Sequence, residues 1–174
     1  MEYINKTDYK LGFLQENIEL LVYSALAFFV PFFAGHPQFL VGTLVNASLI
    51  LAAFNLKGYK LLPVIMLPSL GVLSRGIIFG PFTMFLVYMI PFIWVSNAII
   101  VLVFKRLIKY NKVGTLITGS IAKTAFLFTA AFVLVNLEVV PVLFLTTMGV
   151  FQLYTALAGG AIALGVQFFK RKLA

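Results

Sequence analysis

The sequence predicts an all-α integral membrane protein: one domain over residues 1–174, built as a bundle of six transmembrane helices. Hydrophobic residues make up 62% of the chain and charged residues only 10%, which leaves too little polar surface to cover a domain in water. The apolar residues also form unbroken runs of about the 20 residues that a helix needs to cross a bilayer. Strands of a membrane barrel would instead alternate in segments of about ten residues.

The apolar runs set the positions of the six helices. We expect them at about residues 17–34, 39–54, 61–79, 82–104, 113–135 and 142–169. A short segment before the first helix, about residues 1–16, is expected to lie in the membrane interface. Turn-forming residues end the first helix at Gly35-His36-Pro37 and the third at Gly80-Pro81. The first run lacks the basic start and the small residues of a cleaved signal peptide, so we expect it to be retained.

The basic residues predict the orientation of the bundle. In this layout Arg75 lies on one side of the membrane and Lys123 within a span, whereas the other basic residues fall on the opposite side: Lys6, Lys10, Lys57, Lys60, Lys105, Arg106, Lys109, Lys112, Lys170, Arg171 and Lys172. Lysine and arginine in short loops stay in the cytoplasm. We therefore expect cytoplasmic N and C termini and a place in the bacterial inner (cell) membrane. Attraction to anionic lipid accounts for the net charge of +8, and no nucleic-acid partner is expected.

The residue types that carry most enzyme chemistry are missing. The chain has no cysteine and a single histidine, which excludes disulfides, cysteine-ligated zinc and cysteine-held iron–sulfur clusters. The predicted spans contain no paired carboxylates, no Ser/His/Asp set and no phosphate-binding loop. We therefore expect no enzyme activity, no metal and no cofactor, and the chain cannot hydrolyse ATP by itself.

Polar side chains within the predicted spans are the first candidates for a binding site. Asn46, Asn97, Lys123 and Gln152 lie at about mid-depth of their helices, where a polar group without a partner is costly. Two interpretations stay open, namely hydrogen bonds between helices and contact with a ligand. Lys123 has no Asp or Glu at similar depth. Its amine is therefore either neutral and bonded to Asn, Gln, Thr or backbone oxygens, or available to an anionic ligand.

Two further candidates belong to the third and fourth helices. The third helix contains Pro63, Pro68, Gly71 and Gly76, so we expect it to be kinked or broken, as are the helices that line many transporter sites. Arg75 lies at its outer end and is either a site residue or an arginine that reaches the interface.

Trp94 lies deep in the fourth helix, away from the interface where tryptophan is usually found, and is a candidate for stacking on a ligand. The sixth helix carries small residues four apart, at Ala156/Gly160, Gly159/Ala163 and Ala161/Gly165. These faces suit close helix packing, either within the bundle or against another subunit.

Three short segments resemble a known family. They are GTLVNA at 42–47, LPSLG at 67–71 and IPFIWVSN at 90–97, and they are similar to segments of small six-helix membrane proteins of anaerobic bacteria, in particular the substrate-binding S components of energy-coupling factor transporters. The resemblance covers about residues 21–167. It implies capture of a vitamin or other micronutrient near the outer face, with a transmembrane T component and two ABC-type ATPases as partners.

One feature departs from that family. Its members often carry an Ala-xxx-Ala face on the first helix for docking the T component, whereas here Ala25 and Ala27 are followed four residues later by Phe29 and Pro31. The expected function is a solute-capture subunit of a multi-component importer energised by partner ATPases. The alternatives are a self-sufficient secondary transporter or small channel that acts as an oligomer, and a membrane anchor subunit of a larger complex.

Overall fold

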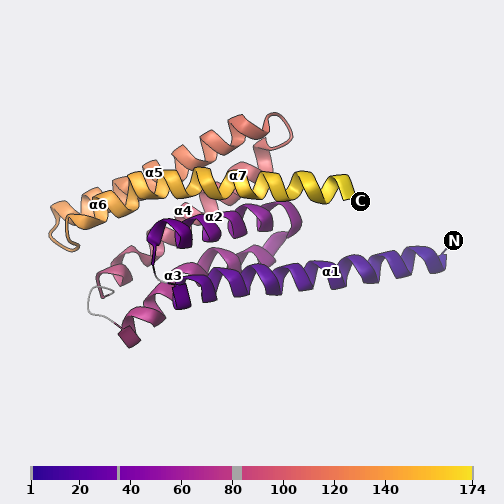
Figure 1. Ribbon diagram of the computed structural model, residues 1–174, viewed down its shortest axis with the longest axis horizontal. Helices are drawn as coiled ribbons and strands as arrows, with labels where there is room; N and C mark the ends of the chain where they lie inside the picture. The colour runs from indigo at the N-terminus through magenta and orange to yellow at the C-terminus, as the bar shows by residue number, and fades with distance from the viewer. Residues whose placement is uncertain (1, 35, 80–83, 174) are drawn as a thin grey trace.

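The chain forms a bundle of long helices, and no strand occurs within its described residues. The computed structural model describes residues 2–34, 36–79 and 84–173. Its helices in chain order are α1 (Glu2–Phe29), the π-helical segment η1 (Val30–Ala34), α2 (Gln38–Asn55), the short 3₁₀ segment η2 (Gly58–Lys60), α3 (Leu61–Phe79), α4 (Leu86–Leu107), α5 (Lys112–Asn136), α6 (Leu143–Met148) and α7 (Val150–Leu173). Figure 1 shows most of them side by side along one axis.

Five segments among the described residues are long and apolar enough to cross a membrane. They are Gly12–Ala34, Gln38–Asn55, Leu86–Leu107, Lys112–Asn136 and Leu143–Lys170. The chain is therefore a helical, multi-pass membrane protein, as the composition predicted. The predicted turn at Gly80-Pro81 and the predicted start of the fourth helix at residue 82 lie outside the described residues.

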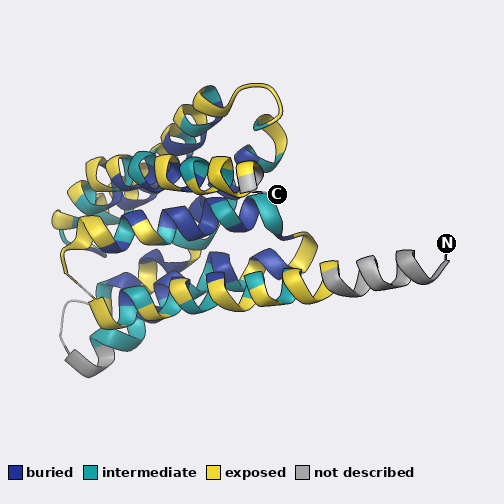
Figure 2. Cartoon of the chain, turned by 45° about the vertical axis from the view of Figure 1, so that its right-hand side comes forward, coloured by how far each residue is buried: buried dark blue, intermediate teal, exposed yellow. Residues whose placement is uncertain are grey.

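The first helix begins much earlier than predicted. α1 is continuous from Glu2, so residues 2–16 belong to the same helix as the first span, and its N-terminal end extends beyond the other helices (Figure 1). The predicted place of this segment in the membrane interface stays a prediction. The reason is that hydropathy marks the end of a membrane span, whereas a helix keeps its internal hydrogen bonds on leaving the bilayer. Most of the described outer face of α1 is exposed (Figure 2), as expected for a helix at the edge of a bundle in lipid.

The third helix is not broken. α3 runs without interruption from Leu61 to Phe79, with Pro68 inside it, so of the two predicted forms the broken one is wrong, and a kink in this helix stays a prediction. Pro63 lies in the first turn, where the missing N–H has no partner to lose. Gly71 lets the helix approach α1 closely, because a Cβ at this position would collide with the carbonyl oxygen of Phe28.

The interruption lies in the last span instead. Gly149 separates α6 from α7, within what the sequence predicted as one helix. A Cβ on Gly149 would lie 2.7 Å from the carbonyl oxygen of Leu145 and 2.8 Å from the ring of Phe128 on α5. The helix therefore breaks where a glycine allows α5 to come close.

Most of the small residues of the last helix pack within the bundle. A Cβ on Gly159 of α7 would lie 2.5 Å from the carbonyl oxygen of Thr43 and 2.8 Å from the nitrogen of Ala47, both on α2. Ala156 and Ala163 on the same helix are fully buried. α7 thus uses its small residues to lie close against α2.

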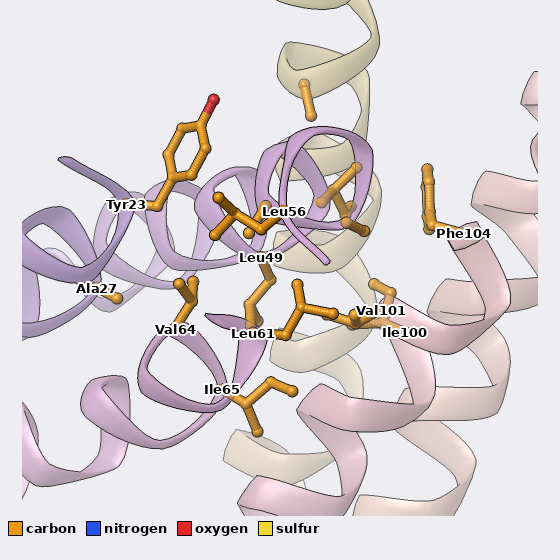
Figure 3. Packing of buried hydrophobic residues seen from close by; sticks show 14 of the residues in the cluster. Tyr23, Ala27, Leu49, Leu56, Leu61, Val64, Ile65, Ile100, Val101 and Phe104 are labelled. Carbon is orange, nitrogen blue, oxygen red and sulfur yellow. The ribbon is translucent and has the colours of Figure 1, made fainter. Parts of the chain in front are cut away.

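The hydrophobic core is divided into two clusters. In the larger one, side chains of α1, α2, α3 and α4 converge (Figure 3), among them Tyr23, Leu49, Val64, Ile100 and Phe104. The second is centred on α4 and α5 and includes Leu86, Met89, Leu127 and Met148. Of these residues, Leu86, Leu127 and Met148 also line the cavity described below.

Ion pairs connect the ends of several helices at one end of the bundle. Nζ of Lys60, between α2 and α3, lies 2.9 Å from Oε2 of Glu16 on α1. One helical turn along α1, Oε1 of Glu19 lies 2.6 Å from Nζ of Lys170 on α7. The segment between α2 and α3 and the end of α7 were both assigned to one side of the membrane from the sequence. They contact the same part of α1.

Candidate functional site

A cavity of about 170 Å³ lies between the helices. Its lining comes from η1, α2, α3, α4, α5, α6 and α7, and it brings together four of the six predicted site residues: Asn46, Asn97, Lys123 and Gln152. These four were predicted from the cost of polar groups at membrane depth. Their convergence from four helices identifies this cavity as the candidate site.

Lys123 is the central polar residue of the cavity. It is 2% exposed, and its Nζ lies 2.6 Å from Oδ1 of Asn46 and 2.8 Å from Oδ1 of Asn97. Lys123 thus links α5 to α2 and α4 through two amide oxygens. These contacts are the interhelical hydrogen bonds of the first interpretation, and they coexist with a position on the cavity wall.

Both asparagines are held in place through their amide nitrogens. Nδ2 of Asn46 donates to the carbonyl of Gly42 at 2.9 Å and to the hydroxyl of Thr155 on α7 at 3.2 Å. Nδ2 of Asn97 donates to the carbonyl of Ile65 on α3 at 2.9 Å. Because both nitrogens are occupied in this way, both oxygens are turned toward Lys123.

Lys123 is the only titratable residue among the described residues that line the cavity. The described carboxylates are elsewhere, since Glu16 and Glu19 pair with lysines at one end of the bundle and Glu138 follows α5. A buried ammonium without a carboxylate is costly in lipid, and two neutral amides only partly compensate for it. With Lys123 in the ammonium form, the arrangement can therefore gain free energy by receiving an anion.

Gln152 lies beside the interruption of the last span. It follows Gly149 by three residues, and both Gln152 and Met148 line the cavity. The side-chain amide of Gln152 makes no hydrogen bond with another residue in the described part of the chain, whereas the backbone carbonyl oxygen of Gln152 accepts from the hydroxyl of Thr155 at 3.2 Å. The amide is thus available to a ligand next to a point where the helix is not continuous.

The cavity extends toward the end of the bundle where α2 begins. Gln38, the first residue of α2, is exposed and belongs to the lining. Asn46 lies eight residues further along the same helix, which is about 12 Å at 1.5 Å per residue. A solute entering beside Gln38 would therefore meet Lys123 near the bottom of the cavity.

Trp94 contacts the cavity wall without lining the cavity. Its indole nitrogen donates to the hydroxyl of Ser69 at 2.8 Å, and Ser69 is a lining residue. The ring packs against the larger core cluster. Trp94 therefore holds a wall residue in place, and stacking of its ring on a ligand stays a prediction.

Arg75 also lies outside the cavity. Its guanidinium donates to the carbonyl oxygens of Phe33 at 3.0 Å and Phe32 at 3.4 Å, both in η1. It thus fixes the end of the first span to α3. η1 also contains Pro31, a fully buried residue that lines the cavity. The contact of Arg75 with η1 therefore affects the cavity wall only indirectly.

Four polar residues of the site were not predicted from the sequence, namely Gln38 near the opening and the hydroxyl residues Ser69, Ser96 and Thr155. Hydroxyl groups are common in membrane helices because they can bond to the carbonyl of their own helix, so they give little signal. The spacing of Thr155, three residues after Gln152 on one helix face, is the feature that could have pointed to it.

No metal site is formed by the described residues, among which no three His, Asp or Glu side chains come together. Comparisons of the chain with models of known families, with curated proteins and with solved structures find no match.

Proposed function

We propose that this protein captures a small solute in the membrane, as the substrate-binding subunit of a multi-component importer for a vitamin or other micronutrient. The observation that carries the proposal is Lys123, a buried lysine that lines a cavity and has no carboxylate partner among the described residues. Ionisable residues within membrane helices are rare and commonly mark solute and ion pathways. The solute therefore carries an anionic group that binds Lys123.

The interrupted last span supports the same function. Discontinuous helices line the substrate sites of many transporters. Here the interruption at Gly149 lies between Met148 and Gln152, two residues of the cavity wall. The sequence suggested this argument for the third helix, and it applies to the sixth span instead.

Energy for uphill transport comes from partners in this proposal. The sequence has no phosphate-binding loop, so ATP hydrolysis falls to two ABC-type ATPases, coupled through a transmembrane T component. The bundle spans the bacterial inner membrane six times with both termini in the cytoplasm, and α3 is the third span. The ion pairs of Lys60 and Lys170 with neighbouring acids of α1 support this orientation, because they gather cations at one end.

Native mass spectrometry of the protein, purified gently from its own membrane, tests the proposal. We expect a small bound molecule and copurifying ATPase subunits. The variant Lys123→Met is expected to lose the molecule, whereas the matched control Lys109→Met, at an exposed lysine, keeps it. A homo-oligomer that carries the molecule alone would favour a self-sufficient transporter, and a large soluble partner without any small molecule would favour a membrane anchor. Either result would overturn the proposal.

A further inference from the structure

The hydrogen-bonding groups of the cavity wall are mostly occupied by the protein itself. The amide nitrogen of Asn46 is bonded to α2 and α7, and that of Asn97 is bonded to α3, as described above. The hydroxyl of Ser69 donates to the carbonyl of Met66 and accepts from Trp94, and that of Ser96 donates to the carbonyl of Ile93, each at 2.8–2.9 Å. These groups hold the wall together and have little left for a ligand.

The free polar groups are therefore few. An ammonium has three hydrogens, and two of those on Lys123 are directed to the amide oxygens of Asn46 and Asn97. One hydrogen of Lys123 and one of the Asn97 amide remain, together with the side-chain amides of Gln152 and of Gln38 near the opening. This set suits one anionic group, bound by Lys123 and a neighbouring amide.

The rest of the lining is apolar. It consists mainly of aliphatic side chains, including Val45, Val72, Ile93 and Leu127. A second charge on the ligand would face these groups without a counter-ion, which is costly. A phosphate group carries about −1.5 to −2 charges at pH 7, which a single lysine does not neutralise.

The volume of the cavity limits the size of the ligand. Cavities of about 150 Å³ accept a benzene molecule, so about 170 Å³ accommodates a carboxylate with a short aliphatic chain or a single small ring. Drug-sized pockets start at about 300 Å³. A ligand larger than this would place only one end in the cavity.

We propose that the cavity binds a small monocarboxylic acid with an apolar body, its carboxylate on Lys123 and Gln152 and its hydrocarbon part against the aliphatic wall. This inference rests on the proposed function, whose solute it specifies. Either form of the lysine gives the same ion pair, because an amine takes the proton of the acid, whereas an ammonium takes the carboxylate directly.

The chain contains its own reporter for this binding. Trp94 is the only tryptophan, and its indole nitrogen is bonded to Ser69 of the cavity wall. Occupancy of the cavity should therefore change the tryptophan fluorescence. The full-length protein in lipid nanodiscs is titrated with a series from acetate to octanoate, with benzoate, and with succinate, inorganic phosphate and 1-pentanol as controls.

We expect affinity to rise about fourfold for each added methylene and then to fall once the chain exceeds the cavity. Pentanoate or benzoate should bind at least tenfold more tightly than succinate, phosphate or 1-pentanol. Lys123→Met should remove binding of the acids, whereas Lys109→Met should not, which separates the cavity from partition into lipid. Binding of the acids to Lys123→Met with unchanged affinity would overturn the inference.

The same measurements separate this inference from the proposed function. If phosphate or succinate binds best and binding depends on Lys123, solute capture stands and the monocarboxylate class is wrong. If no probe binds, but the wild type retains an endogenous molecule that Lys123→Met loses, the class is again wrong and the function stands. If no probe binds and neither protein retains a molecule, both are wrong.

Discussion

Lys123 on α5 donates a hydrogen bond of 2.8 Å to Oδ1 of Asn97 on α4, and both side chains are 2% exposed. The amide nitrogen of Asn97 in turn donates to the backbone of α3 at Ile65. The amide of Asn97 therefore accepts a hydrogen bond from Lys123 through its oxygen and donates one to a backbone carbonyl through its nitrogen. Because the two residues act together, their substitutions should not be additive.

The first prediction is a coupling between these two residues. Asn97→Leu removes one of the two oxygens that hold Lys123 and leaves the lysine poorly satisfied. In a Lys123→Met background that loss no longer matters. We expect Asn97→Leu to destabilise the wild type by about 1–2 kcal/mol more than it destabilises Lys123→Met, measured by thermal unfolding of all four proteins in one detergent. Additive effects would show that the pair contributes no interaction energy.

The second prediction concerns Arg75, which the sequence suggested as a ligand contact. Its guanidinium bonds to the carbonyls of Phe32 and Phe33, so its main effect should be on the end of the first span. We expect Arg75→Ala to cost about 1 kcal/mol, a fall in the unfolding temperature of about 2–4 °C. Arg106→Ala, at an exposed arginine at the end of α4, is the control and should change it little.

Ligand retention separates the two roles of Arg75. If the role of Arg75 is structural, Arg75→Ala lowers ligand retention only in proportion to the fall in stability. Arg75→Lys should then restore part of both the stability and the ligand retention. If Arg75→Ala loses the ligand while the unfolding temperature is unchanged, the arginine contacts the solute directly and the cavity extends further than the described lining.

The third prediction compares two glycines of α7. A Cβ on Gly159 would lie 2.5 Å from the carbonyl oxygen of Thr43, whereas a Cβ on Gly165 would have no neighbour within 4 Å. Gly159→Ala should therefore force α7 away from α2 and cost about 1–3 kcal/mol. Gly165→Ala should be neutral or stabilise by up to about 1 kcal/mol, because alanine favours the helix. Equal unfolding temperatures for the two variants would contradict the close packing of α2 and α7.

Much of the fold could be predicted from hydropathy, since lipid requires helices with long apolar runs. The ends of the helices were less accessible. α1 begins at Glu2 because polar residues end a span and not a helix, and α6 ends just before Gly149, where the ring of Phe128 on another helix leaves no room for a Cβ. Proline and glycine within α3 gave a misleading signal, since Gly71 serves close packing against α1.

The candidate site was predicted in part, for a similar reason. The cost of polar groups at membrane depth singled out Asn46, Asn97, Lys123 and Gln152, and these four line one cavity. Trp94 was selected by depth as well, but depth does not give the rotation of a helix about its axis, and its indole faces the core and Ser69. The hydrogen bonds that orient the asparagines depend on which helices pack together, and this packing cannot be read from the sequence.

The last prediction concerns topology. α5 contains 25 residues, about 37 Å at 1.5 Å per residue, which is enough to separate the exposed Lys109 before it from the exposed Glu138 after it by a whole bilayer. The chain contains no cysteine, so Lys109→Cys and Glu138→Cys each introduce a single thiol. With both termini cytoplasmic, a membrane-impermeant maleimide added to intact cells should label the cysteine at position 138. The cysteine at position 109 should react only after the membrane is permeabilised.

Gln38→Cys, at the exposed opening of the cavity, should behave as position 138 does, because a solute-capture protein opens outward in this proposal. Labelling of positions 109 and 138 from the same side would exclude α5 as a span, and labelling of position 109 alone would invert the orientation.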